Sequence, residues 1–263
     1  MLRVAFSELR KLRRPSLFLG TMGAVVFFSG LFSSLLFLLI DSPQGNARRG
    51  EMISREILSS PKGGVLGFAN VGTFLGIIAL CVFAAQTAQE YTYGTLRNLL
   101  VRQPSRMKIL LGKLAAMKIF AIIMVILAAA VSVSASLLLA PRAKVSTDLW
   151  FSADGKRALL ETFINVIISV IGFGIVGMIL GLLLRSPISA ISLGVLWLLI
   201  VENLLVAVKS STEKWMPGSN LSAIAQGGTS TLEYKHALLV GAGYLLIGGL
   251  FAAGLFKRRD VSN

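Results

Sequence analysis

Charged residues, cysteine and histidine are all scarce in this chain of 263 residues. Only 14% of the residues are charged, 55% are hydrophobic, and the mean hydropathy is +0.77. A soluble domain of this length needs a far more polar surface, so the composition excludes a soluble protein. Cys81 is the single cysteine, which excludes a disulfide within the chain and speaks against a thiolate metal site.

Sequence motifs for enzymatic chemistry are missing as well. The chain has no G-x-x-x-x-G-K-S/T loop for ATP, no H-E-x-x-H and no G-x-S-x-G. We therefore predict no catalytic residue, no metal ligand and no cofactor bound by this chain, and we do not expect an enzyme. The pattern G-x-G-x-x-G at 172–177 lies inside an apolar run, so a dinucleotide site is rejected. Gly177 and Gly181 instead predict close helix packing within one subunit, and a dimer seam is the alternative.

Six long apolar runs stand in place of a polar surface. A bilayer core about 30 Å thick requires roughly 20 helical residues, and each run reaches that length. Helices are expected because backbone groups in lipid must bond within their own segment, and no run alternates like a barrel strand. The sequence predicts an all-α polytopic membrane protein with a single transmembrane permease domain over residues 1–263. The expected spans are 17–40, 64–85, 114–139, 161–184, 188–208 and 237–256.

Basic residues outnumber acidic ones, 26 to 12, which gives a net charge of +14. The cations gather between the apolar runs, where anionic lipid and the insertion bias explain them, so no nucleic-acid partner is predicted. Six spans place both termini on one side of the membrane. The segments on that side hold 14 Lys and Arg, against 11 in the longer segments on the other side. The sequence therefore predicts a multi-pass protein of the cell membrane with both termini in the cytoplasm.

Residues 1–16 have the pattern of an amphipathic helix that ends at Pro15. Such a helix is expected to lie in the membrane interface as an elbow before the first span. A simple basic anchor for that span is the alternative. The apolar face is formed by Leu2, Ala5, Phe6, Leu9 and Leu12, and the polar face by Arg3, Ser7, Arg10, Lys11 and Arg14.

Glu202 and Asn203 are polar residues inside the fifth apolar run. An ionisable residue at the centre of a bilayer costs about 2.5–3.5 kcal/mol on insertion scales, so Glu202 is expected to face the bundle interior or water. One hypothesis places both residues in a translocation path; the other places Glu202 close enough to the interface to reach water. Protonation of its carboxylate, or pairing with a polar group such as Asn165 or Lys118, would reduce that cost.

A basic stretch, Gln86–Lys113, separates the second and third apolar runs. Leu96, Leu99 and Leu100 recur at the spacing of a short amphipathic helix, and Pro104 is expected to end it. A cytoplasmic helix with an apolar ridge among cations is a suitable contact for a partner protein. A loop that merely follows the positive-inside rule is the alternative.

The order E-x-x-x-G-T-L-x-x-L-L-x-x-x-P-x-R-x-x-x-L-x-G-K resembles the cytoplasmic loop after the second span of ABC-2 type permeases, the membrane subunits of type V ABC exporters. Many members place two residues between the proline and the arginine, whereas this chain has only Ser105. The residues that would couple to an ATPase are Glu90, Tyr91, Gly94, Thr95, Leu96, Arg97, Leu99, Leu100, Pro104 and Arg106.

This resemblance implies a coupling helix that docks on a separate cytoplasmic ATPase subunit, which binds the ATP and Mg²⁺. It also implies a second permease subunit, identical or related. Charged residues are nearly absent from the spans, so we expect a hydrophobic or amphipathic substrate, as in multidrug export. A secondary transporter or channel that uses Glu202 as a proton or ion site is one alternative. A membrane scaffold without transport is another.

Overall fold

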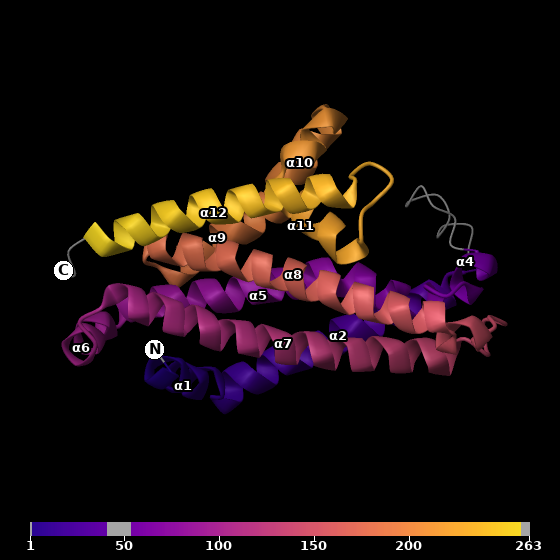
Figure 1. The fold of residues 1–263 in the computed structure, drawn as a ribbon, viewed down its shortest axis with the longest axis horizontal. Helices are drawn as coiled ribbons and strands as arrows, with labels where there is room; N and C mark the ends of the chain where they lie inside the picture. The colour runs from indigo at the N-terminus through magenta and orange to yellow at the C-terminus, as the bar shows by residue number, and fades with distance from the viewer. Residues whose placement is uncertain (1, 41–53, 259–263) are drawn as a thin grey trace.

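The computed structural model describes residues 2–40 and 54–258, and within these ranges the chain forms helices and connecting loops without a strand. Six helical segments are long and apolar enough to cross a membrane, which confirms the all-helical prediction and the number of spans. Most of them run side by side along the long axis of the molecule (Figure 1). These segments are α2 (Pro15–Leu38), η1 with α5 (Gly63–Val65 and Leu66–Thr92), α7 (Arg106–Leu139), α8 (Ala153–Leu184), α9 with η3 and α10 (Pro187–Leu196, Trp197–Val201 and Glu202–Val208) and α12 (Tyr234–Arg258).

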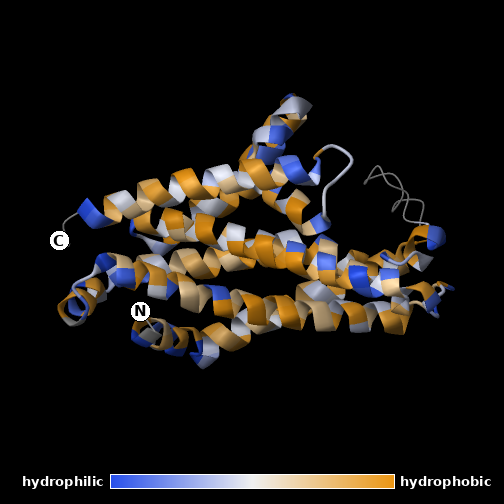
Figure 2. Ribbon diagram, in the orientation of Figure 1, coloured by the Kyte–Doolittle hydropathy of each residue, from blue (hydrophilic) through white to orange (hydrophobic). Residues whose placement is uncertain are grey.

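The second and third spans are longer than their apolar runs. Helix α5 continues seven residues past the expected end at residue 85, and α7 begins at Arg106 rather than at 114. Helical hydrogen bonding continues through polar residues until a breaker intervenes. Here the breakers are Gly94, whose φ of 64° is left-handed, and Pro104. Hydrophobic residues therefore fill the middle of the long helices and hydrophilic ones gather towards their ends (Figure 2).

Helices α5 and α8 form the centre of the bundle, and glycines let them approach closely. A Cβ atom at Gly177 would lie 2.2 Å from the Leu80 carbonyl oxygen, and one at Gly181 would lie 2.8 Å from the Ala84 carbonyl oxygen. The glycine pair therefore packs within this chain, as the sequence predicts.

Two short helices share one end of the molecule with the C-terminal end of α12 (Figure 1). Helix α1 (Leu2–Leu12) packs against α7, and Pro15 then begins α2. Helix α6 (Thr95–Arg102) links α5 to α7. At the opposite end, α4 (Arg55–Ser59) meets η2 (Asp148–Phe151), where the Trp150 indole N–H donates to the Leu58 carbonyl oxygen at 2.9 Å.

The fifth span is not a uniform α-helix. Its middle turn, η3, is π-helical, and α10 projects away from the rest of the bundle (Figure 1). After η4 (Ser210–Trp215), helix α11 (Pro217–Gln226) returns into the bundle and packs against α5, α8 and α12. Gly227, with a φ of 76°, ends α11 in the left-handed conformation that glycine adopts readily.

Candidate functional site

A buried cluster of four charged residues joins α1, α5 and α7; we call Glu8, Lys11, Glu90 and Lys113 the ion cluster. Lys113 is only 3% exposed. Its ammonium donates to Glu8 Oε2 at 2.7 Å, to Glu90 Oε1 at 2.8 Å and to the Gln86 carbonyl oxygen at 3.0 Å. An ammonium group has three N–H donors, so every donor of Lys113 has an acceptor.

Lys11 completes the ion cluster from the side that is open to solvent. Its ammonium lies 2.5 Å from Glu8 Oε1 and 2.8 Å from Glu90 Oε1. The cluster thus contains two ammonium groups and two carboxylates, and its formal charge sums to zero. A buried ion pair is tolerated when its charges balance and its hydrogen bonds are made, as they are here.

The protonation of the ion cluster follows from these contacts. Burial would raise the pKa of Glu8, but the nearby charges of Lys113 and Lys11 outweigh it and hold that pKa below the usual 4.5. Burial would lower the pKa of Lys11, but the carboxylates of Glu90 and Glu8 outweigh it and hold that pKa above the usual 10.5. The carboxylate of Glu8 and the ammonium of Lys11 are therefore both charged around neutral pH.

Residues 90–106 comprise the end of α5, helix α6 and the first residue of α7; we call this segment the α6 loop, and it contacts the bundle at several further points. Leu96 is only 2% exposed and packs in a cluster with Leu182 of α8 and Phe256 of α12. Arg106 donates to the Phe256 carbonyl oxygen at 2.9 Å, at the C-terminal end of α12. The Arg185 guanidinium, at the start of the α8–α9 link, lies 5.3 Å from the centre of the Tyr91 ring.

These contacts locate the residues that the sequence singled out as coupling residues. Glu90, Tyr91, Leu96 and Arg106 face the bundle, so the ridge predicted to contact a partner is partly turned inward. The surface of the loop is formed by other residues of the same stretch, with half-buried Leu99 and Leu100 between the two sets. The exposed members between residues 90 and 106 are Thr92, Tyr93, Gly94, Thr95, Arg97, Asn98, Val101 and Pro104.

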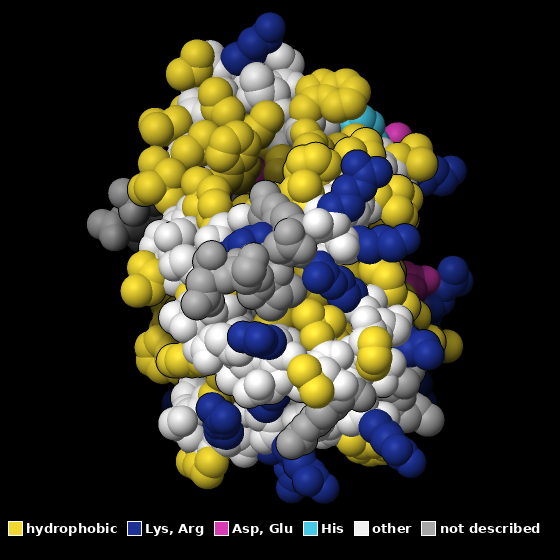
Figure 3. Space-filling model, turned by 90° about the vertical axis from the view of Figure 1, so that its left-hand side faces the viewer, with side chains coloured by type: hydrophobic (Ala, Val, Ile, Leu, Met, Phe, Trp, Pro, Cys, Tyr) yellow, Lys and Arg dark blue, Asp and Glu magenta, His cyan; other side chains and the backbone are white. Residues whose placement is uncertain are grey.

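The end of the molecule that carries α1, α6 and the end of α12 is strongly basic. Lys and Arg side chains are scattered over it, and few acidic side chains are visible on this face (Figure 3). The acidic residues nearby, Glu8 and Glu90, are buried in the ion cluster. Burial of the acids leaves the surface of this end with mostly positive charge.

Sequence reasoning missed Glu8 and Lys113 and assigned Lys11 to the solvent-facing side of α1. The pairs Glu8–Lys113 and Glu90–Lys113 span 105 and 23 residues of sequence, so helical periodicity could not bring them together. One signal was available. Glu8 is the single acidic residue among five basic ones in residues 1–16, and an isolated acid in a basic helix indicates a specific cationic partner.

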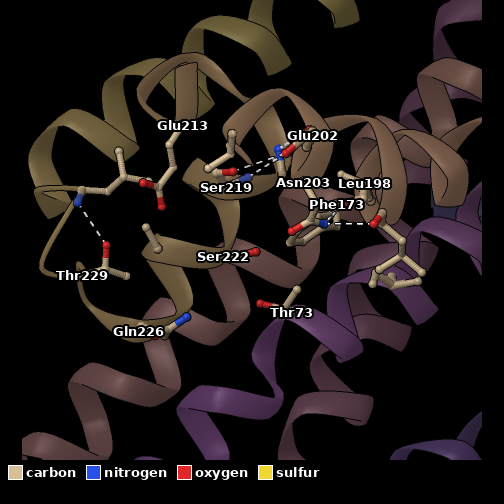
Figure 4. Close-up of a pocket in the computed structure, with 16 residues that line it drawn as sticks. Thr73, Phe173, Leu198, Glu202, Asn203, Glu213, Ser219, Ser222, Gln226 and Thr229 are labelled. Carbon is tan, nitrogen blue, oxygen red and sulfur yellow. Dashed lines mark hydrogen bonds between the residues drawn. The ribbon is translucent and has the colours of Figure 1, made fainter. Parts of the chain in front are cut away.

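A second polar region lies between α5, α8, α11 and the fifth span. It is a cavity of about 290 Å³, which we call the polar cavity. Thr73 of α5 and Ser222 and Gln226 of α11 direct polar groups towards it (Figure 4). Its remaining lining is Ile77, Phe173, Leu198, Leu199, Glu202, Asn203, Val206, Glu213, Gly218, Ser219, Ala223, Thr229 and Leu232.

Glu202 lies at the wall of the polar cavity and is only 3% exposed. Its Oε1 accepts from the Gly218 backbone N–H and from the Trp197 indole N–H, both at 2.9 Å, and its Oε2 accepts from the Ser219 backbone N–H at 3.0 Å. The carboxylate therefore satisfies the first turn of α11, where helical N–H groups lack partners and favour negative charge.

The hypothesis that Glu202 pairs with Asn165 or Lys118 is wrong. Asn165 accepts instead from the Tyr234 hydroxyl at 2.6 Å, and Lys118 is exposed on α7. Asn203 donates to the carbonyl oxygens of Leu198 and Leu199 within its own helical segment. The two residues predicted to line a translocation path do both line the polar cavity.

A family model described as "Protein of unknown function (DUF2705)" matches residues 22–262, which is most of the chain. The chain belongs to this family. No curated protein matches it. In this DUF2705 member the matched part includes Glu90, Lys113 and Glu202, whereas Glu8 and Lys11 of α1 precede it.

The charges of the two polar regions differ in this DUF2705 member. The ion cluster pairs two carboxylates with two ammonium groups. Among the residues that the structure describes, the polar cavity is lined by two carboxylates, Glu202 and Glu213, and by no Lys, Arg or His. Within the described residues, no group of three or more His, Cys, Asp or Glu is placed to hold a metal ion.

Proposed function

We propose that this chain is the membrane-spanning permease subunit of an ATP-binding-cassette exporter. It would form the translocation path and couple to a separate cytoplasmic ATPase subunit, which binds ATP and Mg²⁺. The complex would contain a second permease subunit and would export a hydrophobic or amphipathic molecule. In this arrangement both termini and α6 lie in the cytoplasm.

The observation that carries the proposal is the way the α6 loop is anchored. The loop presents an exposed surface at one end of the bundle, and its inward side contacts four other elements through different kinds of bond. Glu90 bonds to α1 and α7, Leu96 packs on α8 and α12, and Arg106 bonds to the end of α12.

Such anchoring suits a segment that receives force from a partner. A push on a loosely held loop would be lost in local bending, whereas packed side chains and buried bonds move as a unit. Closure of a partner ATPase around ATP would therefore shift α6 together with the ends of α5, α7 and α12. The exporter then alternates between states that nucleotide binding favours differently.

Val101 offers the sharpest test, because it is apolar, 79% exposed and on the outer face of α6. Val101→Asp should abolish co-purification of an ATP-hydrolysing subunit with the tagged chain in native membranes. Leu149→Asp is the matched control, since Leu149 is apolar, 51% exposed and at the opposite end of the bundle. Equal recovery of ATPase activity with Val101→Asp and the unaltered chain would contradict the proposal.

The orientation can be tested independently. Cys81 is the single cysteine, so a Cys81→Ser background allows one new thiol to be placed at will. A cysteine substituted at Asn98 should resist a membrane-impermeant maleimide on intact cells, and a cysteine at Leu149 should react. Labelling at position 98 on intact cells would exclude a cytoplasmic coupling helix.

A secondary transporter remains the second candidate, because Glu202 lines a cavity within the bundle. It predicts transport that a protonophore dissipates and that ATP depletion alone does not affect. The ATP-driven exporter predicts the reverse. A scaffold without transport predicts that neither treatment alters substrate distribution.

A further inference from the structure

We infer that the polar cavity binds an organic cation with an apolar body, such as a quaternary ammonium compound, and that Glu202 faces its charge. The inference rests on the proposed function, because it names the class of molecule that the permease would carry. It refines the expectation of an amphipathic substrate by assigning the sign of its charge.

The first step is the charge of the site. The chain has more than twice as many basic as acidic residues, yet the lining of the polar cavity includes two of the acids and none of the bases. Glu202 is almost fully buried, and all the groups that bond to it are uncharged N–H and O–H donors. A buried carboxylate without a counter-charge attracts a cation that enters beside it.

The second step is the hydrogen bonding. Both oxygens of Glu202 already accept bonds from Trp197, Gly218 and Ser219, so little acceptor capacity is left for an N–H donor. A quaternary ammonium group carries charge but no N–H, and it needs only proximity to the carboxylate. Phe173 also lines the cavity, and an aromatic face attracts such a cation.

The third step is the rest of the lining. Ile77, Leu198 and Leu199 supply apolar surface for the body of the ligand. A volume of about 290 Å³ is far larger than a bare metal ion and suits a small organic molecule. The side chains of Thr73, Ser222 and Gln226 make no hydrogen bond to the described residues, so their polar groups can meet water that enters with the ligand (Figure 4).

The test uses the full-length chain in lipid nanodiscs and radiolabelled phenyltrimethylammonium, with empty nanodiscs as the blank. The unaltered chain should bind the probe saturably. tert-Butylbenzene has the same shape without the charge and should displace the probe at least tenfold less effectively. Glu202→Gln should weaken binding at least tenfold. Glu161→Gln is the control, because Glu161 is an exposed carboxylate that pairs with Arg157 outside the cavity.

Three results would overturn the inference: no binding above empty nanodiscs, equal binding by Glu202→Gln, or equal displacement by the uncharged isostere. If Glu202→Gln does not fold, Ser222→Leu replaces it. A larger side chain at position 222 fills the cavity, while the Glu202 carboxylate keeps its hydrogen bonds. Unchanged binding by Ser222→Leu would count against the site. Binding of the probe to this chain does not require an ATPase, so the two proposals can fail separately. If the probe binds but no ATPase co-purifies, the exporter proposal is contradicted. If an ATPase co-purifies but the probe does not bind, only the inference about the polar cavity is contradicted.

Discussion

The ion cluster and the polar cavity both contain buried glutamate side chains, Glu8 and Glu90 in the first and Glu202 in the second, and the groups that surround these carboxylates differ. In the ion cluster, Lys11 and Lys113 each face both Glu8 and Glu90, and all of these contacts except Lys11–Glu8 join different helices. In the polar cavity, Glu202 faces only the backbone and side-chain donors at the start of α11 and its own helix. The balanced site is suited to holding helices together, and the unbalanced site is suited to receiving a charge from outside.

Removing one charged residue of the ion cluster should lower the free energy of unfolding more than any other change considered below. Lys113→Met keeps the length of the side chain but leaves two buried carboxylates with Lys11 alone, and breaking a buried ion pair costs about 3–5 kcal/mol. Thermal unfolding in detergent should report that loss. Lys118→Met is the matched control, because Lys118 lies on the same helix and is exposed. A loss no larger than that of Lys118→Met would show that the ion cluster does not stabilise the fold.

The second prediction concerns pH. The pKa of Glu8 is lowered on folding, so its contribution to stability is present above pH 4.5 and is lost as the pH falls through the folded-state pKa. The pKa of Lys11 is raised, so its contribution is present below pH 10.5 and is lost as the pH rises through the folded-state pKa. Melting temperature should therefore stay level between about pH 5 and 10 as far as these two groups are concerned. Glu8→Gln should make the melting temperature less dependent on pH below about pH 5. An unchanged dependence on pH in that range would contradict the contribution assigned to Glu8.

Substitutions of Glu202 in the polar cavity are expected to have the smallest effects on the free energy of unfolding. Glu202→Ala leaves the N–H groups of Trp197, Gly218 and Ser219 without their acceptor, which should cost about 1–3 kcal/mol of stability. Glu202→Gln keeps one acceptor oxygen but turns an NH2 donor towards the N–H groups that the other oxygen served, so it should cost less than Glu202→Ala without being neutral. Comparing the melting temperatures of the two variants separates the acceptor role of Glu202 from its charge. If both variants cost as much as Lys113→Met, the contrast between the two sites fails.

Features that depend on local sequence could be predicted. The six spans follow from apolar runs of about 20 residues, because the bilayer imposes that length on any helix that crosses it. The short helix α6 follows from leucine spacing between Gly94 and Pro104. The close packing of Gly177 and Gly181 against α5 could be predicted because glycine has no side chain to keep the two helices apart.

Features that depend on where helices dock could not be predicted. The periodicity of α1 placed Lys11 on the polar face, and no local rule states that this face meets Lys113 of α7 and Glu90 of α5. The donors around Glu202 were missed for another reason, since backbone N–H groups have no sequence signature. Pro217 was the available signal, because proline favours the first turn of a helix and so marks N–H groups in need of an acceptor.

The π-helical turn at Trp197–Val201 has a mechanical consequence. It places the Trp197 indole beside the side chain five positions later, Glu202, which an ordinary α-helix would carry to a different face. One residue corresponds to about 100° of rotation in an α-helix. If the extra residue of this turn were taken up, α10 would swivel by about that angle and withdraw the Glu202 carboxylate from the beginning of α11. The hydrogen bonds between Glu202 and the start of α11 thus depend on the winding of the fifth span.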